Sequence, residues 1–410
     1  MGISLDNVCV IGLGRVGLPL SLAIAEAGFK VFGHDIDESV VSQINQKKMP
    51  FREVNADILL KKHTNLNFFP STDSSSMKNC AYIIICLGTP VDEHLNPDYS
   101  QINAILDLLK KNLSIGQTLI FRSTVAPGTT EFIKDNLERS TQLLCGKDFF
   151  MAFCPERIAE GNAIVEIKVV PQIIGGITQA CSNKAKSFFD KITYECLVTD
   201  AKSAELAKLF TNMYRYINFA ISNEFAIIAS EHDRQIHEIT HLVNHNYKRG
   251  GLPYPGFTAG PCLYKDGFFM LNNIPFAELI TSSWRINEGL PNYLLQKIKK
   301  EYGSIKGKKA VILGLSFKKN HDDTRNSLSF KLKKSLIMEQ CEVKLHDPFV
   351  KGYDQELSKV LEGAEIIIIA TNHDIYKSLS RKRLSELANN CIVCDIWNIT
   401  GERKLIYDLK

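Results

Sequence analysis

The segment NVCVIGLGRVG, residues 7–17, constrains the fold of this 410-residue chain more than any other. An apolar run typical of a buried strand ends at Gly12, and a helix pattern begins after Gly17. The spacing G-x-G-x-x-G lets a strand turn tightly into a helix and lets the backbone approach a pyrophosphate, whose charge meets the helix N-terminus. We therefore expect a dinucleotide to be bound by Gly12, Leu13, Gly14, Arg15, Val16 and Gly17.

A second strand pattern, KVFGHDID, carries Asp35 near its end. This is the spacing at which an acid bonds the ribose hydroxyls of a dinucleotide. No Arg follows Asp35, and Asp37 adds negative charge that would repel a ribose phosphate. The pattern therefore favours NAD over NADP as the cofactor.

Strand and helix patterns alternate through the first part of the chain, which indicates a doubly wound parallel sheet. Residues 200–233 contain no Gly or Pro and predict one helix, roughly 45–50 Å long at about 1.5 Å per residue. Such a helix would link two domains, and its apolar face could pair with another subunit. Its apolar positions are Leu206, Leu209, Phe210, Met213, Ile217, Ala220, Ile221, Phe225 and Ile228.

Strand patterns return after Gly307 and resemble an internal repeat of the first part. VCVIGLG matches AVILGLS, and KVFGHDID matches EVKLHDPF. The predicted fold class is α/β, with an N-terminal Rossmann domain over residues 1–199, a central long-helix domain over 200–300 and a C-terminal Rossmann-like domain over 301–410. A structural duplication without shared function is the alternative.

The second copy keeps Gly314 but has Ser316 where the second glycine would stand, so we expect no second dinucleotide there. The loop that follows carries Lys318, Lys319 and Arg325, and arginine suits bidentate contacts with phosphate. This loop could hold a smaller phosphorylated group, or it could be a solvated charged loop.

Charge and cysteine usage exclude several classes. The formal net charge of +4 is too small to predict a nucleic-acid partner. Eleven cysteines are scattered along the chain and no leader pattern precedes the first strand, so we expect a reducing, cytoplasmic location. The apolar run EIIIIAT is too short to span a bilayer, so no membrane association is expected.

The segment HEITH, residues 237–241, matches the H-E-x-x-H pattern of zinc proteases, and His245 extends the row. The surrounding chain lacks an obvious third acid ligand. We therefore expect no metal, with Glu238 and the histidines on a solvated helix face. A zinc hydrolase built on His237 and His241 is the alternative function of another class.

Two further groups are candidates for catalysis. Lys208 and Asn212 are four residues apart and share one face of the predicted helix. A Lys and an amide directed at one pocket can stabilise a developing oxyanion, although the same pair could be ordinary surface polarity. Cys262, in the segment GPCLYKDG, is either a small structural residue or a nucleophile.

Six motifs in order make nearly the whole chain resemble the nucleotide-sugar 6-dehydrogenases, the UDP-glucose and UDP-N-acetylhexosamine dehydrogenase family. The motifs are GLGRVGLPLS, RSTVAPGTT, CPERIAEG, AELAKLFTNMYRYINFAISNE, PGFTAGPCLYKDG and LGLSFKKNHDDTRNS. Single-step hydroxyacid dehydrogenases share the glycine loop and a helical Lys and Asn. They lack the cysteine loop and the third domain.

The resemblance implies that the enzyme oxidises a primary alcohol to a carboxylate and uses two NAD per sugar. Cys262 would attack the intermediate aldehyde, and the resulting thioester would be hydrolysed by water. Lys208 and Asn212 would steady the oxyanion. Asp266 would pair with Lys208 or act as a base near Cys262.

The resemblance also assigns contacts to the two ligands. Thr124 and Glu160 would lie beside the nicotinamide and the reacting carbon, with Glu160 activating the hydrolytic water. The remaining cofactor contacts would be Thr89, Pro90 and Ser123. Substrate contacts would be Glu156, Arg249 (from a partner subunit), Gly260 and, in a UDP-binding C-terminal domain, Lys318 and Arg325.

The chain departs from the family pattern in two places. Gly260 is preceded by Ala259, where the family has a glycine pair, and Trp397 stands where the family has an arginine that contacts the diphosphate.

PERIAEG resembles the N-acetylhexosamine branch, whereas CLYKD resembles the UDP-glucose branch. We therefore expect a UDP-N-acetylhexosamine substrate, with UDP-glucose as the alternative. The resemblance further implies a homodimer or larger and precursor supply for capsule or lipopolysaccharide; a catalytically inactive nucleotide-sugar sensor is a further alternative.

Overall fold

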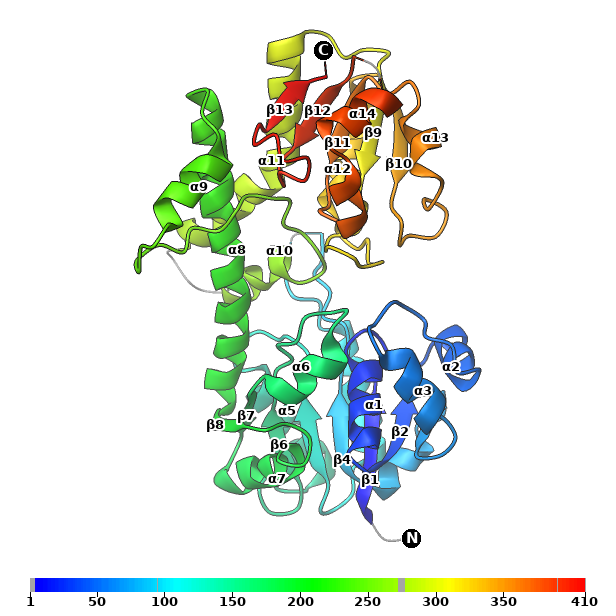
Figure 1. The fold of residues 1–410 in the computed structure, drawn as a ribbon. Helices are drawn as coiled ribbons and strands as arrows, with labels where there is room; N and C mark the ends of the chain where they lie inside the picture. Colours follow the sequence, from blue (N-terminus) through cyan, green and yellow to red (C-terminus); the bar gives the residue numbers. More distant parts are fainter. Residues whose placement is uncertain (1–3, 94, 272–276, 389, 410) are drawn as a thin grey trace. The chain divides into compact units, whose positions relative to one another are not determined.

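The computed structural model describes residues 4–93, 95–271, 277–388 and 390–409. The chain divides into two compact units. The first comprises Met1–Thr211 with Phe268–Asn272, and the second comprises Asn212–Gly267 with Asn273–Lys410. The predicted α/β class is confirmed, because each unit is built on its own largely parallel sheet (Figure 1).

The first unit contains an eight-stranded sheet in the order β3-β2-β1-β4-β5-β6-β7-β8. Its strands are β1 (Ser4–Ile11), β2 (Lys30–His34), β3 (Phe68–Ser71), β4 (Cys80–Ile85), β5 (Thr118–Phe121), β6 (Phe150–Phe153), β7 (Gln172–Gly176) and β8 (Cys196–Asp200). Neighbouring strands run parallel except β6 and β7, which pair antiparallel. The order reverses at β1, which lies between β2 and β4, and ligands of such sheets bind at the carboxyl ends of the strands near this reversal.

Both faces of this sheet are covered by helices. Val8 and Val10 of β1 belong to one buried cluster, and the alternating residues Cys9 and Ile11 belong to another. This alternation follows from the two-residue period of a strand. The helices are α1 (Gly17–Glu26), α2 (Glu38–Asn45), α3 (Ala56–His63), η1 (Ser75–Asn79), α4 (Ser100–Asn112), α5 (Thr129–Thr141), α6 (Ala163–Val169) and α7 (Gln179–Phe189).

Helix α8 (Ala201–Glu231) runs from the first unit into the second, and the helix predicted over residues 200–233 is confirmed. Its apolar residues lie on more than one face. Leu209 and Met213 are buried, whereas Phe210 and Phe225 are 59% and 44% exposed.

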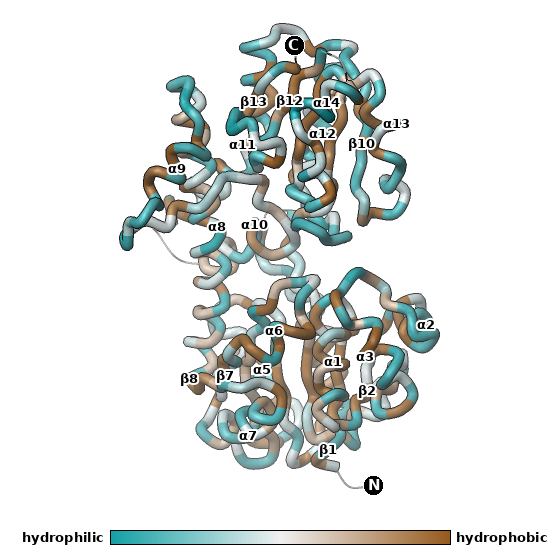
Figure 2. The backbone as a smooth tube through the Cα atoms, viewed as in Figure 1, coloured by the Kyte–Doolittle hydropathy of each residue, from teal (hydrophilic) through white to brown (hydrophobic). Residues whose placement is uncertain are grey.

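The second unit contains a five-stranded sheet in the order β10-β9-β11-β12-β13. Its strands are β9 (Lys309–Leu313), β10 (Glu342–His346), β11 (Ile366–Ile369), β12 (Ile392–Asp395) and the antiparallel β13 (Ile406–Asp408). In Figure 2, hydrophobic segments run through the interior of each unit, and hydrophilic segments are frequent in the surrounding loops. The remaining elements are α9 (Ile236–Asn244), α10 (Leu263–Asp266), η2 (Phe268–Met270, in the first unit), α11 (Glu278–Tyr302), α12 (Leu328–Met338), α13 (Leu357–Leu361), η3 (Asp374–Ser378) and α14 (Arg381–Leu387).

The repeat expected from the sequence extends to individual hydrogen bonds. Gly12 and Gly314 have φ angles of +89° and +91°. The N–H of Gly12 donates to the carbonyl of His34 at 2.8 Å, and the N–H of Gly314 donates to the carbonyl of His346 at 2.8 Å. Each glycine therefore starts the same turn at the carboxyl end of a central strand.

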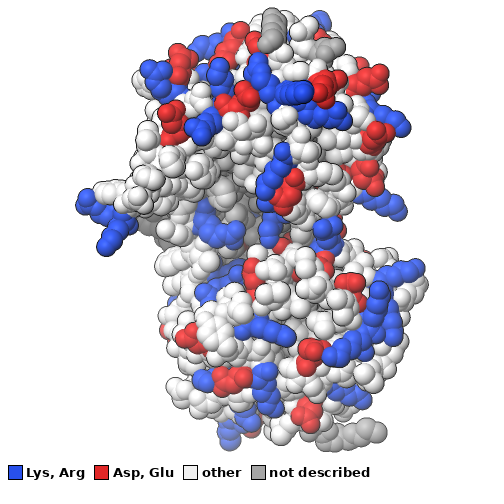
Figure 3. Space-filling view, in the orientation of Figure 1, with Lys and Arg blue, Asp and Glu red and all other residues white. Residues whose placement is uncertain are grey.

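No helix in the described ranges has the length and apolar character needed to cross a membrane. On the face shown in Figure 3, Lys and Arg are interspersed with Asp and Glu.

Candidate active site

The glycine loop between β1 and α1 is shaped by three different constraints. A Cβ atom on Gly12 would lie 2.4 Å from the carbonyl oxygen of Cys86, and one on Gly17 would lie 1.8 Å from the carbonyl oxygen of Gly12. These positions hold the strand, the turn and the helix in close contact. A Cβ on Gly14 would meet no atom within 4 Å, so the backbone there faces open space. This is the room that a pyrophosphate needs.

Asp35 lies just beyond β2 and fixes this loop from the side. Its Oδ2 accepts a 2.7 Å hydrogen bond from the N–H of Leu13, and its Oδ1 accepts one of 3.0 Å from the N–H of Asp37. The side chain is only partly buried. The carboxylate therefore lies at the loop with accessible surface, as an acid that contacts a ribose must. Arg15 of the same loop lies over the ring of Phe51, 5.0 Å from its centroid.

The other expected cofactor residues follow neighbouring strands. Thr89 and Pro90 come after β4, and Ser123 and Thr124 come after β5, so all four lie at the carboxyl edge of the sheet near β1. The hydroxyl of Ser123 is buried and has no hydrogen-bond partner among the described residues. A buried polar atom without a partner is uncommon and fits a group that a ligand satisfies. Open space at Gly14 and this hydroxyl are thus compatible with a bound dinucleotide.

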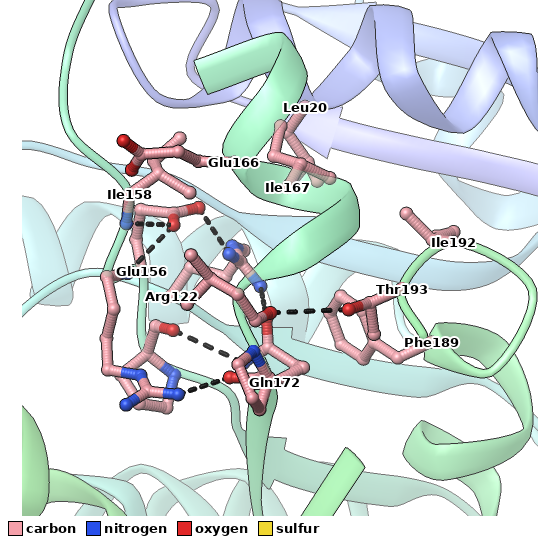
Figure 4. A pocket seen from close by; sticks show the side chains of 14 residues that line it. Leu20, Arg122, Glu156, Ile158, Glu166, Ile167, Gln172, Phe189, Ile192 and Thr193 are labelled. Carbon is pink, nitrogen blue, oxygen red and sulfur yellow. Dashed lines mark hydrogen bonds and ion pairs between the residues drawn. The ribbon is translucent and has the colours of Figure 1, made fainter. Parts of the chain in front are cut away.

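Glu156 takes part in a buried ion pair with Arg122 (Figure 4). Its Oε1 also accepts hydrogen bonds from the N–H groups of Arg157 and Ile158 at 2.8 and 2.9 Å. Burial alone would raise the pKa of the Glu156 carboxyl, but the guanidinium of Arg122, the N–H of Ile158 and the ammonium of Lys208 together outweigh it, and the pKa is lowered. Arg122 is held in turn by Gln172, whose Oε1 accepts from Nη1 at 2.9 Å.

This pair changes the role expected for Glu156. The cavity around it measures about 10 Å³, which is room for about one water molecule and not for a sugar. The carboxylate expected to hold substrate is bonded within the protein instead, while the main-chain carbonyl of Glu156 accepts a hydrogen bond from Nζ of Lys208. Glu156 therefore fixes the loop after β6 and the ammonium group of Lys208.

Glu160 lies farther along the same loop and is half-buried. Glu53 anchors the loop immediately after it, because its carboxylate accepts from the N–H groups of Gly161 and Ala163 at 2.8 and 2.7 Å. Glu53 carries no motif and was not found from the sequence. Its partners lie more than 100 residues away.

In the second unit, Asn212 and Asp266 are in direct contact. Nδ2 of Asn212 donates to Oδ2 of Asp266 at 2.6 Å, and Nζ of Lys265 lies 3.4 Å from Oδ1. Asp266 has no exposed surface. The sequence predicted that Asp266 pairs with Lys208 or acts as a base near Cys262. Nζ of Lys208, in the first unit, donates to the main-chain carbonyl of Glu156, and the cation beside Asp266 within the second unit is Lys265.

Cys262 stands at the start of α10 and is exposed. Its carbonyl accepts the N–H groups of Lys265 and Asp266 at 3.1 and 3.0 Å, which closes the short helix. Gly260 has a φ of +102°, and a Cβ there would lie 2.7 Å from the ring of Phe317. The cysteine loop is therefore packed against the loop that follows β9.

That second loop contains the two cations expected to bind phosphate. Lys318 is half-buried, and Arg325 is exposed. The carboxylate of Asp323 accepts from Nη2 and Nε of Arg325 at 2.5 and 3.0 Å, so part of the arginine charge is already balanced. Arg249 lies elsewhere in the unit, in an exposed loop after α9, with its guanidinium 5.2 Å from the ring centroid of Tyr247.

The HEITH segment forms most of α9, but its histidines are not equivalent. His241 and Glu238 are exposed, as expected for a solvated face. The same expectation is wrong for His237, which is buried, stacks on Tyr254 at 5.4 Å and has Nε2 3.2 Å from the carbonyl of Ile396. Burial lowers the pKa of His237. No cluster of three or more His, Cys, Asp or Glu side chains suited to a metal occurs among residues 4–93, 95–271, 277–388 and 390–409.

A cavity of about 510 Å³ lies beside this segment within the second unit. Its wall includes Tyr254, Trp397, Asn398 and Arg403. Trp397 packs so closely that a Cβ on Gly256 would lie 2.2 Å from its ring. Asn398 accepts the N–H of Arg403 at 2.7 Å, which positions an exposed arginine at the cavity.

Three models of one family match the chain in sequence order. The NAD binding domain of the UDP-glucose/GDP-mannose dehydrogenase family matches residues 6–193, its central domain matches 202–288, and its UDP binding domain matches 311–402. The cofactor expected from the sequence, NAD, is therefore confirmed.

Relatives match the chain over nearly its full length. The UDP-N-acetyl-D-mannosamine dehydrogenase of Pyrococcus horikoshii is 34% identical, over 97% of this chain and 96% of its own. The enzyme of the same name from Campylobacter jejuni is 31% identical, over 90% of this chain and 95% of its own. The solved structure of the UDP-D-ManNAc dehydrogenase from Pyrococcus horikoshii superimposes with a TM-score of 0.88 at 31% identity, covering 93% of each chain.

Proposed function

Because the chain belongs to the UDP-glucose/GDP-mannose dehydrogenase family, we propose that it oxidises the 6-hydroxyl of a UDP-sugar to a carboxylate in two NAD-dependent steps. One observation carries the proposal furthest. The exposed Cys262 stands at the start of the short helix α10, whose last residue, Asp266, is buried and accepts a hydrogen bond from Asn212 of α8, so the nucleophile is followed four residues later by a fixed polar pair.

The proposed substrate is a UDP-N-acetylhexosamine. Relatives that match over nearly their whole length are named UDP-N-acetyl-D-mannosamine dehydrogenases, which supports an N-acetylated sugar. UDP-glucose is the alternative within the class. The product, a UDP-uronic acid, would serve as a precursor for capsule or lipopolysaccharide in the cytoplasm.

In the proposed mechanism the same carbon is oxidised twice, first from the alcohol to the aldehyde and then to the acid. NAD, when bound, accepts a hydride in each step. In the first step the primary alcohol loses a proton and a hydride and becomes an aldehyde. The thiolate of Cys262 then adds to the aldehyde carbon, and loss of the second hydride leaves a thioester. Water attacks the thioester, and the carboxylate and the thiol are released.

The polar residues around this chemistry would act on protons and negative charge. Lys208 and Asn212, one turn apart on α8, would donate to the oxygen that becomes negative in each step. Asp266 would hold Asn212 in the donating orientation through its 2.6 Å hydrogen bond. Glu160 would remove a proton from the hydrolytic water, and Thr124 would lie beside the nicotinamide.

The UDP moiety is assigned to the second unit. Lys318 and Arg325 would contact the diphosphate from the loop after β9. We assign a further cation, Arg403, to the same task, because Trp397 occupies the position where the family has an arginine and Arg403 lines the neighbouring cavity. We therefore divide the chain by function into three parts: an NAD-binding part (1–199), a central part (200–300) and a UDP-binding part (301–410).

A second copy of the chain is the proposed partner of α8. The helix leaves a row of apolar side chains exposed at helical spacing: Phe210, Tyr214, Ile221, Phe225 and Ile228. Such a row on one helix face is typical of an interface. A dimer would also be able to bring Arg249 of one copy to the substrate of the other.

The test of the function is the amount of NADH formed per UDP-sugar consumed, with UDP-glucose, UDP-GlcNAc, UDP-GalNAc and UDP-ManNAc as substrates. Two NADH per sugar with one of the N-acetylated sugars is the expected result. One NADH per sugar would mean that the aldehyde is released, and the role of Cys262 would have to be withdrawn. No NADH with any of the four would overturn the proposed reaction, and zinc-dependent hydrolysis would contradict it directly.

A further inference from the structure

Two cysteines outside the proposed active site lie in contact in the first unit. Cys145 belongs to the loop between α5 and β6, and Cys181 belongs to the first turn of α7. Their Sγ atoms are 3.7 Å apart, which places an S–H hydrogen bond between them. This contact joins residues 36 positions apart in the sequence.

The surroundings of Cys181 favour a thiolate. Its Sγ accepts a hydrogen bond from the main-chain N–H of Met151 at 3.3 Å and from the hydroxyl of Thr178 at 3.2 Å. Together with Cys145, three donors thus point at one buried sulfur atom. The hydrogen bond from Cys145 is the largest cause that lowers the pKa of Cys181 to about 5, and the same bond raises the pKa of Cys145.

Other buried thiols of the chain have the opposite environment. Burial raises the pKa of Cys80, Cys154 and Cys391 to about 12 in each case. These groups are therefore neutral near pH 7, and a neutral thiol is a poor nucleophile. Cys145 and Cys181 differ from these thiols in two ways: their sulfur atoms are in contact, and hydrogen-bond donors point at the sulfur of Cys181.

The two sulfurs also differ in access. Cys181 is fully buried, whereas Cys145 is half-buried and lies in a loop. A small reagent would therefore reach Cys145 first, with Cys181 directly behind it as the second nucleophile. This order is the one that a pair of thiols needs in order to close a disulfide.

We propose that Cys145 and Cys181 form an oxidation site that a small-molecule disulfide converts into an intramolecular disulfide. The pair begins with one shared proton, which passes to Cys181 as the Cys145 sulfur attacks the reagent. One thiolate leaves and a mixed disulfide forms on Cys145. Cys181 transfers its proton to the released thiolate, attacks the Cys145 sulfur and expels the second thiolate. Two protein sulfurs are oxidised, and one reagent disulfide is reduced to a thiol and a thiolate.

The site is remote from the expected cofactor edge of the sheet. Cys145 precedes the amino end of β6, and Cys181 follows the carboxyl end of β7, which runs antiparallel to β6. Both ends lie opposite the carboxyl edge that carries the glycine loop. Closing the disulfide should therefore leave NAD binding unchanged, and this separates the proposal from the proposed function.

The experiment uses the full chain in glutathione buffers of increasing oxidised fraction at pH 7. Remaining thiols are alkylated, and proteolytic peptides are identified by mass. The expected result is a cross-linked peptide that contains Cys145 and Cys181, formed at a lower oxidised fraction than any other disulfide, with Cys262 free of the cross-link. Formation should be lost in Cys145→Ser and in Cys181→Ser and retained in the control Cys341→Ser.

Each contrary outcome is specific. A stable glutathione adduct on Cys145 without a cross-link would overturn the proposal, because Cys181 would then not act as the second nucleophile. Unmodified Cys145 and Cys181 peptides at every glutathione ratio would also overturn it. If Cys181→Ser does not fold, Cys145→Ala, a change in a half-buried loop, gives the same test.

Discussion

The side-chain amide of Asn212 donates a 2.6 Å hydrogen bond to Oδ2 of Asp266, a carboxylate without exposed surface. Lys265 lies on the other oxygen at 3.4 Å. The two carboxylate oxygens face two donors, Asn212 and Lys265. Asparagine at position 266 would offer only one side-chain oxygen, so in either orientation its NH₂ group would face one of these donors. We expect Asp266→Asn to lower the free energy of unfolding by about 3–5 kcal/mol, the cost of breaking a buried pair, measured by urea unfolding. A change under about 1 kcal/mol would show that the contact is not formed.

Replacement of Cys262 separates catalysis from folding. Cys262 is exposed, so Cys262→Ala should leave the unfolding transition in place while lowering acid production by roughly a thousandfold or more. The measurement is the UDP-uronic acid formed, followed by mass spectrometry. Cys341→Ala, a half-buried cysteine of the same unit, is the control and should retain full activity. Undiminished acid production by the Cys262 variant would remove it from the mechanism.

The glycine loop offers a matched pair of substitutions. Gly14→Ala places a methyl group in open space, so the fold should remain intact while the Kd for NAD rises about tenfold or more, because the pyrophosphate loses its room. Gly17→Ala places the same methyl group 1.8 Å from the carbonyl oxygen of Gly12 and should destabilise the first unit as well. Calorimetric titration with NAD and thermal unfolding of both variants test this. Equal stability of the two variants would contradict it.

The substitution Glu156→Gln should change how the free energy of unfolding depends on pH, relative to the native chain. The pKa of Glu156 is lowered from its usual 4.5, so the carboxylate stabilises the fold above that pH and loses this contribution as the pH falls through its lowered value. We expect a deficit of about 3–5 kcal/mol at pH 7 that narrows in acid. Urea unfolding at a series of pH values measures it, with Glu131→Gln, which removes an exposed pair with Lys202, as the control. A deficit that widens in acid would be contrary to this assignment.

The apolar row on α8 predicts the oligomeric state. Phe225 is 44% exposed, so Phe225→Arg should cost little in the single chain but introduce two buried charges in a dimer. Light scattering should show a dimer or larger for the native chain and a monomer for the variant. Leu242→Arg, at a residue of α9 that is 67% exposed, should leave the mass unchanged. A native monomer would reject α8 as the interface.

The fold could be predicted where local pattern decides it. The strand–turn–helix at Gly12 follows from spacing and backbone sterics, and the long helix follows from the absence of Gly and Pro. The antiparallel pairing of β6 with β7 could not be predicted in this way, since a short strand pattern does not specify the direction of its neighbour. His237 is buried, contrary to the prediction, and its ring contacts the main-chain carbonyl of Ile396. This contact likewise could not be predicted, because Ile396 lies far along the chain.

The candidate site was predictable as a set of residues but not as a set of partners. The motif placed Glu156 in the site, yet its carboxylate binds Arg122, whose position is fixed by a different strand. Glu53 and the contact between Cys145 and Cys181 carry no periodic signal at all, because each depends on chain segments brought together only by folding.

The repeated turn has a consequence for how two nucleotides are handled. Asp35 is partly accessible, whereas its counterpart Asp347 is fully buried and accepts from Leu315 at 2.7 Å, with His373 at 3.1 Å. Both acids accept main-chain hydrogen bonds, but only Asp35 keeps accessible surface, so only the first acid can receive a ribose. In the proposed reaction, spent NADH must be exchanged for fresh NAD while the sugar stays covalently attached. The two turns share a backbone, but only the first offers an accessible carboxylate to its nucleotide. NADH could therefore leave the first turn without loosening the UDP group in the second unit.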